Sequence, residues 1–570
     1  MKTFWITFYS YKGGVGRSLA LANVAALLVQ RGRNVVLIDF DLEAPGLDSF
    51  QEFKSIAGKA GVVEYVTEFE NTKRAPDISQ FVHLCELPGQ SRGKLWIMPA
   101  GKKDKSYNSL RTKLDWIQLY DSKFGEQFIE NWKAAIARYC QPDYVLVDSR
   151  TGLTDIGGIC TLHLPDLVVM LFGLNEQNVR GIAAVARTIR ESEFKRIPQL
   201  HYVASPVPNL PRDKESALTK RWAAATNDLG VKVESSIRYQ SIAALNERLF
   251  VLNDPSESLL LNEDYRNLLL KIIDYNRNGV DFLLMQARVA IRTVDTDRME
   301  RLLSIFQEEF PSRSESLMIQ AELKQALNVG EDAIELAYEA IKIDPTYQEP
   351  FDWLVSQHTR EGRPTEILAL CNYLLQFSER FSTNRLMMIH TTRGQNAMTI
   401  GDYASAVESH NFCFEQTSKT SKIPELLLVQ GFNLVESTRR KERMPYAETW
   451  KEIISYFEKA GEASASPLII QANHWQAMHI PFSLTGEIAR AREALKKARR
   501  AAELVGLAED IFSVKNYTNV TVEEWLKIND EMLAALERGQ LWDGMLLPTE
   551  DAATEKPIRK ETPEKAGGKT

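Results

Sequence analysis

The feature that most constrains the fold of this chain is a glycine-rich turn between a strand-like run and a helical pattern. Residues 3–9 read TFWITFY, residues 12–18 read KGGVGRS, and a helical pattern covers residues 18–31. In this order, the backbone N–H groups of the turn and the positive end of the following helix bind phosphate oxygens, whatever side chains lie nearby. The order predicts a phosphate-binding loop whose unhindered turn is formed by three glycines: Gly13, Gly14 and Gly16.

The loop departs from the usual phosphate-loop pattern at two positions. That pattern has a glycine, four residues and then Gly-Lys-Ser/Thr, but here Tyr11 stands in place of the first glycine and Arg17 in place of the lysine. Ser18 keeps the hydroxyl group. As the first helical residue, it is placed to ligate Mg²⁺.

Short apolar runs alternate with helical patterns over residues 1–275. Strands that are buried on both faces of a parallel sheet have this nearly continuous apolar character, and helical crossovers join them. We therefore predict an α/β phosphate-loop nucleoside triphosphatase (P-loop NTPase) domain with a mainly parallel sheet. Its expected strands include residues 3–9, 34–40, 94–100, 143–149, 167–173 and 199–205.

Residues 282–547 read as one helical pattern after another, and we expect an all-α helical solenoid there. Pro311 and Pro345 are 34 residues apart, as are Met299 and Ala333, and 34 residues is the tetratricopeptide period. Small residues recur where the two helices of such a repeat cross; they are Ala321, Ala333, Ala340, Gly394, Gly401, Ala406, Cys413, Ala491 and Ala498. An irregular helical bundle is the alternative.

Composition argues against several other classes of protein. A net charge of −7 speaks against a surface that coats nucleic acid, and the basic stretch 101–113 is read as a solvated loop. The five cysteines lack metal-ligand spacing, which suits a reducing cytoplasm. The sequence contains no uninterrupted apolar run of about 20 residues, so we expect no integral membrane association. Residues 521–536 form an acidic amphipathic segment that we read as a solenoid cap, and the charged tail 549–570 is expected to be disordered.

The motif KGGVGRS resembles that of the deviant Walker A ATPases of the ParA/MinD type. In that family the early lysine, here Lys12, reaches across a nucleotide-sandwich dimer to the phosphates of the partner, so the missing first glycine is normal. Two further segments resemble the family: VVLIDFDLEAPGLD, which contains the Asp-x-Asp pair, and YVLVDSRTG, which corresponds to the Walker B and switch II segment.

The resemblance implies a role for each matching residue. Asp41 would position the attacking water, while Ser18, Asp39 and Asp148 would lie at the magnesium ion, and Lys12 and Arg17 would supply charge in catalysis. ATP with Mg²⁺ is the expected cofactor. The expected nucleotide contacts are Gly13, Gly14, Val15, Gly16, Arg17, Ser18, Leu19, Gly152 through its N–H group, and Asn209 as a loose candidate.

Some assignments near the loop stay open at this stage. Arg17 keeps the positive charge of a lysine, but it is longer, planar and forked, so we expect it to bind phosphate while catalysis is slow. The alternative is that Arg17 points to solvent. Ile237 and Arg238 are candidates for the base pocket, and Arg150 is read as a surface salt-bridge partner rather than a phosphate ligand.

Together these motifs predict a cytoplasmic ATP-binding dimerisation switch, with slow hydrolysis, whose helical repeats recruit a partner protein. A nucleotide-dependent homodimer is expected, and repeat-fused relatives resemble components of bacterial signalling or phage defence. Two alternatives remain: a scaffold that binds nucleotide without hydrolysing it, and a small-molecule kinase or ligase built on the same fold.

Overall fold

The computed structural model describes most of the chain. The described residues are 2–88, 92–114, 125–152, 158–192, 196–209, 215–244, 247–252, 255–329, 332–420, 468–505, 510–513 and 518–541, with the single residues 433, 434, 437, 454 and 547. The predicted disordered tail, 549–570, lies outside them. The chain divides into two compact units, Met1–Pro350 and Phe351–Thr570.

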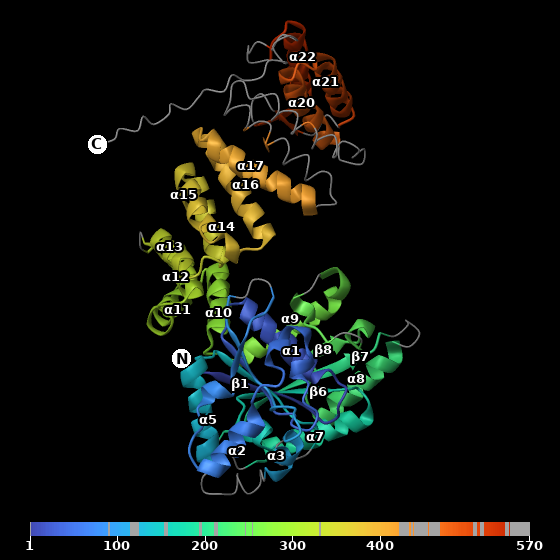
Figure 1. The fold of residues 1–570 in the computed structure, drawn as a ribbon, viewed down its shortest axis with the longest axis vertical. Coiled ribbons are helices and arrows are strands. Elements are labelled where there is room, and N and C mark those ends of the chain that lie inside the picture. The colour runs from blue at the N-terminus through green and yellow to red at the C-terminus, as the bar shows by residue number, and fades with distance from the viewer. Residues whose placement is uncertain are drawn as a thin grey trace, which may run out of the picture. The chain divides into compact units, whose positions relative to one another are not determined.

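The first unit contains a mainly parallel sheet (Figure 1), as the sequence predicts. In the described part of the chain its strands are β1 (Phe4–Ser10), β2 (Val35–Asp39), β3 (His83–Cys85), β4 (Leu95–Met98), β5 (Tyr144–Asp148), β6 (Leu167–Phe172), β7 (Gln199–Val207) and β8 (Ser235–Arg238). Their order is β3-β4-β2-β5-β1-β6-β7-β8, and only β3 pairs antiparallel. Each of the six predicted strands is present.

Helices cover both faces of this sheet. They are α1 (Arg17–Gln30), α2 (Val62–Thr72), α3 (Tyr107–Lys113), α5 (Gly125–Cys140), α7 (Glu176–Arg190), α8 (Glu215–Leu229) and α9 (Pro255–Tyr275). Alternate residues of β1 enter different cores: Ile6 and Phe8 pack with α1 and α9, whereas Trp5 packs with α2 and α5. Because successive strand side chains point to opposite faces, such a strand is apolar throughout.

Both units also contain short 3₁₀ or π-helical segments. They are η1 (Leu47–Ser49), η2 (Gln51–Ile56), η3 (Ile78–Gln80), η4 (Ile159–His163), η6 (Ser241–Ala244), η7 (Phe250–Leu252) and η8 (Ser378–Arg380).

Helices follow the sheet in the sequence, as expected. They are α10 (Val280–Thr293), α11 (Thr296–Glu309), α12 (Ser314–Leu327), α13 (Ala333–Ile343), α14 (Gln348–Arg360), α15 (Pro364–Leu375), α16 (Thr383–Ile400), α17 (Tyr403–Thr420), α20 (Leu468–Leu484), α21 (Ile488–Glu503) and α22 (Val522–Glu537). The helices α10, α12 and α14 begin 34 residues apart, which is the predicted period. The tetratricopeptide assignment itself stays a prediction.

Most of the predicted small residues are buried where helices pack. Ala321, Ala340 and Ala406 have no exposed surface, and a Cβ atom on Gly394 of α16 would lie 2.4 Å from Nε2 of His410 on α17. The segment expected to cap the helices is α22, whose apolar side chains are buried around Trp525. No helix in the described residues is long and apolar enough to cross a membrane.

One detail differs from the expectations. The C-terminal region is not entirely helical, because β9 (Asp510–Ser513) pairs antiparallel with β10 (Thr518–Thr521), two short segments that contain β-branched and aromatic residues. The expected domains, 1–275 and 282–547, meet at the break between α9 and α10, and the compact unit that contains the sheet continues to Pro350. This division into domains stays a prediction.

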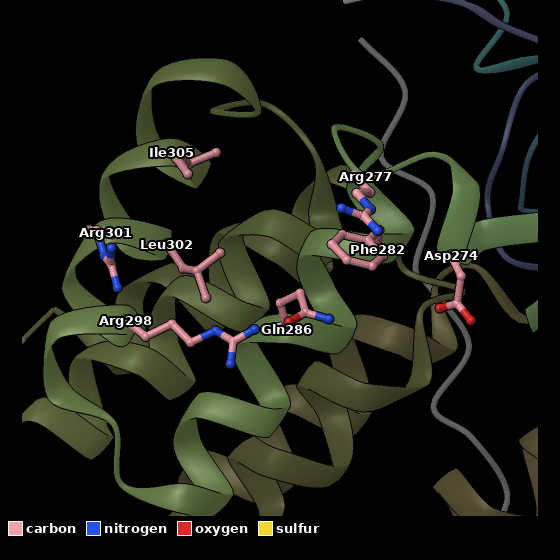
Figure 2. Close-up of a pocket in the computed structure, with 8 residues that line it drawn as sticks. All are labelled: Asp274, Arg277, Phe282, Gln286, Arg298, Arg301, Leu302 and Ile305. Atoms are coloured by element: carbon pink, nitrogen blue, oxygen red, sulfur yellow. Dashed lines mark hydrogen bonds between the residues drawn. The ribbon is translucent and has the colours of Figure 1, made fainter. Parts of the chain in front are cut away.

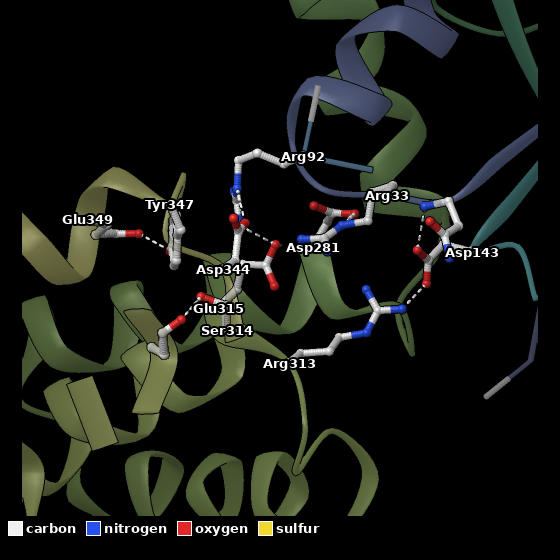
Figure 3. A network of polar contacts seen from close by, with 12 residues as sticks. Arg33, Arg92, Asp143, Asp281, Arg313, Ser314, Glu315, Asp344, Tyr347 and Glu349 are labelled. Atoms are coloured by element: carbon white, nitrogen blue, oxygen red, sulfur yellow. Dashed lines mark hydrogen bonds and ion pairs between the residues drawn. The ribbon is translucent and has the colours of Figure 1, made fainter. Parts of the chain in front are cut away.

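A network of ion pairs joins the sheet to α10–α13 within the first unit (Figure 3). Arg33, between α1 and β2, is buried and pairs with Asp281 of α10 at 2.9 Å and with Glu315 of α12 at 3.4 Å. Arg92 pairs with the same Glu315 at 2.8 Å and with Asp344 at 2.8 Å. The network therefore fixes α10 and α12 against the ends of the strands.

Candidate nucleotide-binding site

The predicted phosphate loop connects β1 to α1 and is shaped as a cradle. Gly14 and Gly16 have φ values of 77° and 76°, in the left-handed region that glycine adopts at no steric cost. A Cβ atom on Gly13 or Gly14 would meet no described residue within 4 Å, so the described part of the chain leaves the space above the loop open. No side chain in the described part of the chain caps the N-terminus of α1. The free N–H groups of its first turn therefore suit an anion.

Two residues of the predicted set anchor the loop through their backbone. Val15 is buried, and its carbonyl oxygen accepts a hydrogen bond from the Ser205 hydroxyl of β7 at 2.7 Å. Leu19 packs against the core, and its carbonyl oxygen accepts a hydrogen bond from the side chain of Asn23 at 2.8 Å. The backbone of Val15 thus ties the loop to β7, and Leu19 holds the start of α1 against the core.

Arg17 neither points to solvent nor lies over the open loop. Its side chain is buried; Nε donates to Oδ1 of Asp148 at 2.5 Å, and Nη2 donates to Oδ2 of Asp41 at 2.8 Å. Burial alone would lower the pKa of this guanidinium, but Asp148 and Asp41 outweigh burial and raise it. In this structure Arg17 thus binds the two carboxylates that the resemblance assigns to water positioning and to magnesium.

The predicted carboxylates gather because β2 and β5 are neighbours. Asp39 and Asp148 are register partners at the ends of these strands, and Asp39 accepts hydrogen bonds from the N–H groups of Asp41 and Leu47. Burial raises the pKa of Asp39, and the nearby Asp148 raises it further. Burial also raises the pKa of Asp148, although Arg17 opposes this effect. The cluster therefore holds a proton or a cation more readily than separate carboxylates do.

The chemistry of these residues fits a magnesium ion. Mg²⁺ prefers oxygen ligands and keeps several waters, so one or two carboxylates and a hydroxyl suffice beside substrate phosphates. Within the described residues, Oδ2 of Asp148 is buried without a hydrogen-bond partner, and the nearby Ser18 hydroxyl acts to lower the pKa of Asp148. No group of three or more His, Cys, Asp or Glu side chains among the described residues is arranged to hold a metal by itself.

Lys12 and Gly152 make contacts within this chain. The Lys12 ammonium donates to the side-chain oxygen of Gln177 on α7. Gly152, with φ 81°, directs its N–H group to the carbonyl oxygen of Ser10 at 3.4 Å, a long hydrogen bond beside the loop. Both residues therefore lie at the loop, but each already has a partner.

The remaining candidates lie in different surroundings. Asn209 is exposed beyond the end of β7. The Arg238 guanidinium binds Asp264 of α9 at 2.7 Å, and its assignment to the base pocket stays a prediction. Ile237 lies in the hydrophobic core. Arg150 pairs with Glu43 at 2.6 Å, in agreement with its reading as a salt-bridge partner.

Sequence reasoning missed three residues that shape the site. Ser205 holds the loop through Val15, and Gln177 holds Lys12. Gly181 of α7 lies against Tyr11, since a Cβ atom at Gly181 would come within 2.1 Å of the tyrosine ring. Of the three, only Gly181 could have been found from the sequence, because a glycine inside a helix often marks a place where another group packs closely against the backbone.

The chain is similar to several known proteins. The family model CbiA, described as the CobQ/CobB/MinD/ParA nucleotide binding domain, matches residues 6–319. A plasmid partition protein from Borrelia burgdorferi has 17% identity and a TM-score of 0.34, over 48% of this chain and 99% of that one. The cell division ATPase MinD from Pyrococcus furiosus has 15% identity and a TM-score of 0.36, with the same coverage.

A third solved structure was determined with a nucleotide. The septum site-determining protein MinD from Pyrococcus horikoshii, complexed with Mg-ADP, has 14% identity and a TM-score of 0.34, over 48% of this chain and 96% of that one. No curated protein sequence matches the chain. Because the family model covers more than half of its residues, the chain belongs to the CobQ/CobB/MinD/ParA family of nucleotide-binding domains.

Proposed function

We propose that this protein is an ATP-dependent switch that dimerises through its nucleotide domain and thereby changes how its C-terminal helices meet a partner protein. The observation that carries the proposal is the position of Arg17, buried between Asp41 and Asp148. One cation of the phosphate loop is thus bound to the carboxylates that hydrolysis requires. Such an arrangement has two states, depending on whether Arg17 binds carboxylate or phosphate.

The phosphates of ATP are anions that would compete with the two carboxylates for Arg17. Guanidinium groups bind phosphate and carboxylate with the same forked geometry, so phosphates in the cradle compete with Asp41 and Asp148 for this side chain. Once released, Asp41 is free to orient a water molecule, and Asp148 and Ser18, with Asp39, can hold Mg²⁺. That ion would neutralise phosphate charge. Because Arg17 must exchange partners in each cycle, we expect slow hydrolysis.

The proposal of a dimer rests on the contact that Lys12 makes. Its ammonium makes an exposed hydrogen bond to the neutral amide oxygen of Gln177. A phosphate of a second subunit is a stronger acceptor than an amide, because a bond between two charged groups is roughly twice as strong as a neutral one. Lys12 can therefore exchange Gln177 for that phosphate when two ATP-bound copies meet.

Two elements connect the nucleotide site to α10–α13. The helix α1 begins at Arg17 and ends at Gln30, shortly before Arg33, which pairs with Asp281 and Glu315. The strand β5 ends at Asp148, and Asp143 immediately before it pairs with Arg313. A shift of either element on nucleotide binding would therefore move a charged residue of the network. This is the route by which the helices would report the nucleotide state.

Light scattering coupled to size exclusion tests the switch. We expect monomers without nucleotide and with ADP, and dimers with ATP and Mg²⁺. Asp41→Ala should keep the ATP-dependent dimer for longer while losing phosphate release. Asp228→Ala, which removes an exposed carboxylate of α8, is the matched control. A monomer in every nucleotide state contradicts the switch.

A nucleotide-binding scaffold without hydrolysis is the second candidate, and the same observation favours it. If Arg17 stays on Asp41 and Asp148 when ATP binds, the carboxylates remain blocked and nucleotide serves only to stabilise the fold. Tight ATP binding with no release of phosphate, even from ATP-dependent dimers, supports this candidate.

A further inference from the structure

A pocket of about 710 Å³ lies between the end of α9, α10 and α11, and it shares no residue with the nucleotide site. Figure 2 shows three arginine side chains around it: Arg277, from the turn after α9, and Arg298 and Arg301, from α11. Arg298 and Arg301 are three positions apart, so they project from the same side of the helix. The lining contains a single carboxylate, Asp274.

The positive charge of these arginines is not neutralised within the described residues. Arg298 donates to the side-chain oxygen of Gln286, a neutral acceptor, and Nε of Arg301 donates to the backbone oxygen of Asp297 at 3.2 Å. The described part of the chain gives Arg277 no ion pair. By contrast, Arg33 and Arg92 in the same unit each bind two carboxylates.

An apolar surface lies beside this charge. Phe282 of α10 and Leu302 and Ile305 of α11 also line the pocket, and Leu302 is buried. The volume of the pocket is within the range of roughly 300–1,000 Å³ that is typical of small-molecule sites. The pocket thus combines several hydrogen-bond donors for an anion with a wall for an apolar group.

We propose that this pocket binds a small organic phosphate. The phosphate group would be held by Arg298 and Arg301, with Arg277 at the rim, and the organic part would lie on Phe282 and Leu302. Phosphate suits this set because a guanidinium donates two parallel hydrogen bonds to its oxygens. The bond to Gln286 holds the Arg298 guanidinium in place without neutralising it, which lowers the cost of ordering the side chain on binding. The proposal does not depend on the nucleotide switch.

Phosphorus-31 NMR with phenyl phosphate as the probe tests the site. The full chain is titrated in the presence of Mg²⁺ and excess ADP, so that the phosphate loop is occupied. We expect saturable broadening of the probe signal, and weaker binding of inorganic phosphate, which lacks the apolar part. Arg298→Gln, and separately Arg277→Gln combined with Arg301→Gln, should each weaken binding of phenyl phosphate about 10-fold or more, as the loss of charge-assisted hydrogen bonds implies.

Arg292→Gln is the matched control. Arg292 is an exposed arginine of α10 whose Nε donates to the backbone oxygen four residues earlier, as that of Arg301 does, but it does not line this pocket. It should bind phenyl phosphate like the wild type. Arg298→Lys, which keeps the charge but not the fork, should bind with intermediate affinity. Unsaturable broadening in the wild type, or equal affinity in Arg298→Gln and the wild type, would overturn the proposal.

Discussion

Nε of Arg33 lies 2.9 Å from Oδ2 of Asp281, and both side chains are almost completely buried. The two residues are 248 positions apart, one beside the sheet and one on α10. The Tyr144 hydroxyl donates to the same oxygen of Asp281 at 3.1 Å, so this carboxylate is satisfied from two sides. A buried pair of this kind adds little net stability, but breaking it leaves a charge without a partner.

We therefore expect Arg33→Met to lower the free energy of unfolding of the first unit by about 3–5 kcal/mol. Calorimetry should show a lower melting temperature for that unit. Arg187→Met, which removes an exposed arginine of α7, should change stability by less than about 0.5 kcal/mol. Adding Asp281→Leu to Arg33→Met should recover part of the loss. An Arg33→Met protein as stable as the wild type would show that the pair is not buried in solution.

Removal of Arg17 should make the free protein sensitive to magnesium. In Arg17→Ala, Asp41 and Asp148 lose their guanidinium partner and become free for another cation. We expect MgCl₂ at millimolar concentration to raise the melting temperature of this variant by several degrees more than that of the wild type, without nucleotide. NaCl of equal ionic strength separates binding from screening. Arg150→Ala, which loses only its pair with Glu43, should respond like the wild type.

Arg17→Lys should hydrolyse ATP faster than the wild type. Lysine carries a single ammonium group and cannot bind Asp41 and Asp148 through a rigid fork, so it leaves these carboxylates more readily for the phosphates. An increase in turnover of roughly 10-fold corresponds to about 1.4 kcal/mol in the barrier. Phosphate release at saturating ATP measures this increase. Equal and rapid hydrolysis by both proteins would contradict a restraining role for Arg17.

The sheet and the loop were predictable because their signals are local. Continuous apolar runs mark buried strands, and the glycines of KGGVGRS mark the turn. The family resemblance implied that Asp39 and Asp148 lie together, whereas the pairing of β2 with β5 that brings them together is seen only in the structure. The direction of Arg17 was not predictable, since its partners come from the ends of two other strands. Arg33 likewise reads as a surface residue of a loop until Asp281 is seen beside it.

Gly181→Ala should disturb the loop from α7. The new methyl group would come within 2.1 Å of the Tyr11 ring, close to its attachment, so the tyrosine must leave its position. We expect a loss of about 1–3 kcal/mol in stability, as for other overpacked sites, and weaker ATP binding in equilibrium dialysis. Gly158→Ala is the control, because a Cβ atom there meets nothing within 4 Å and its φ of −61° suits alanine. If the two variants bind ATP equally, Tyr11 does not shape the loop.

Acid should destabilise the first unit partly through His201. This imidazole lies between the Tyr275 and Ser235 hydroxyls, and burial lowers its pKa from 6.5 to about 4. Between these values the unfolded chain binds a proton that the folded chain does not, so stability is full above pH 6.5 and falls as the pH drops towards 4. His201→Gln keeps hydrogen-bonding groups but cannot titrate.

The measurement for His201 is the free energy of unfolding by urea at several pH values. The difference between His201→Gln and the wild type should shift in favour of the variant as the pH falls, by at most about 1.4 kcal/mol per pH unit and on the order of 3 kcal/mol at pH 4. The difference removes the contribution of other buried histidines, such as His390 and His474, which both proteins contain. A difference that is constant from pH 7 to pH 4 would mean that His201 is accessible to protons in the folded protein.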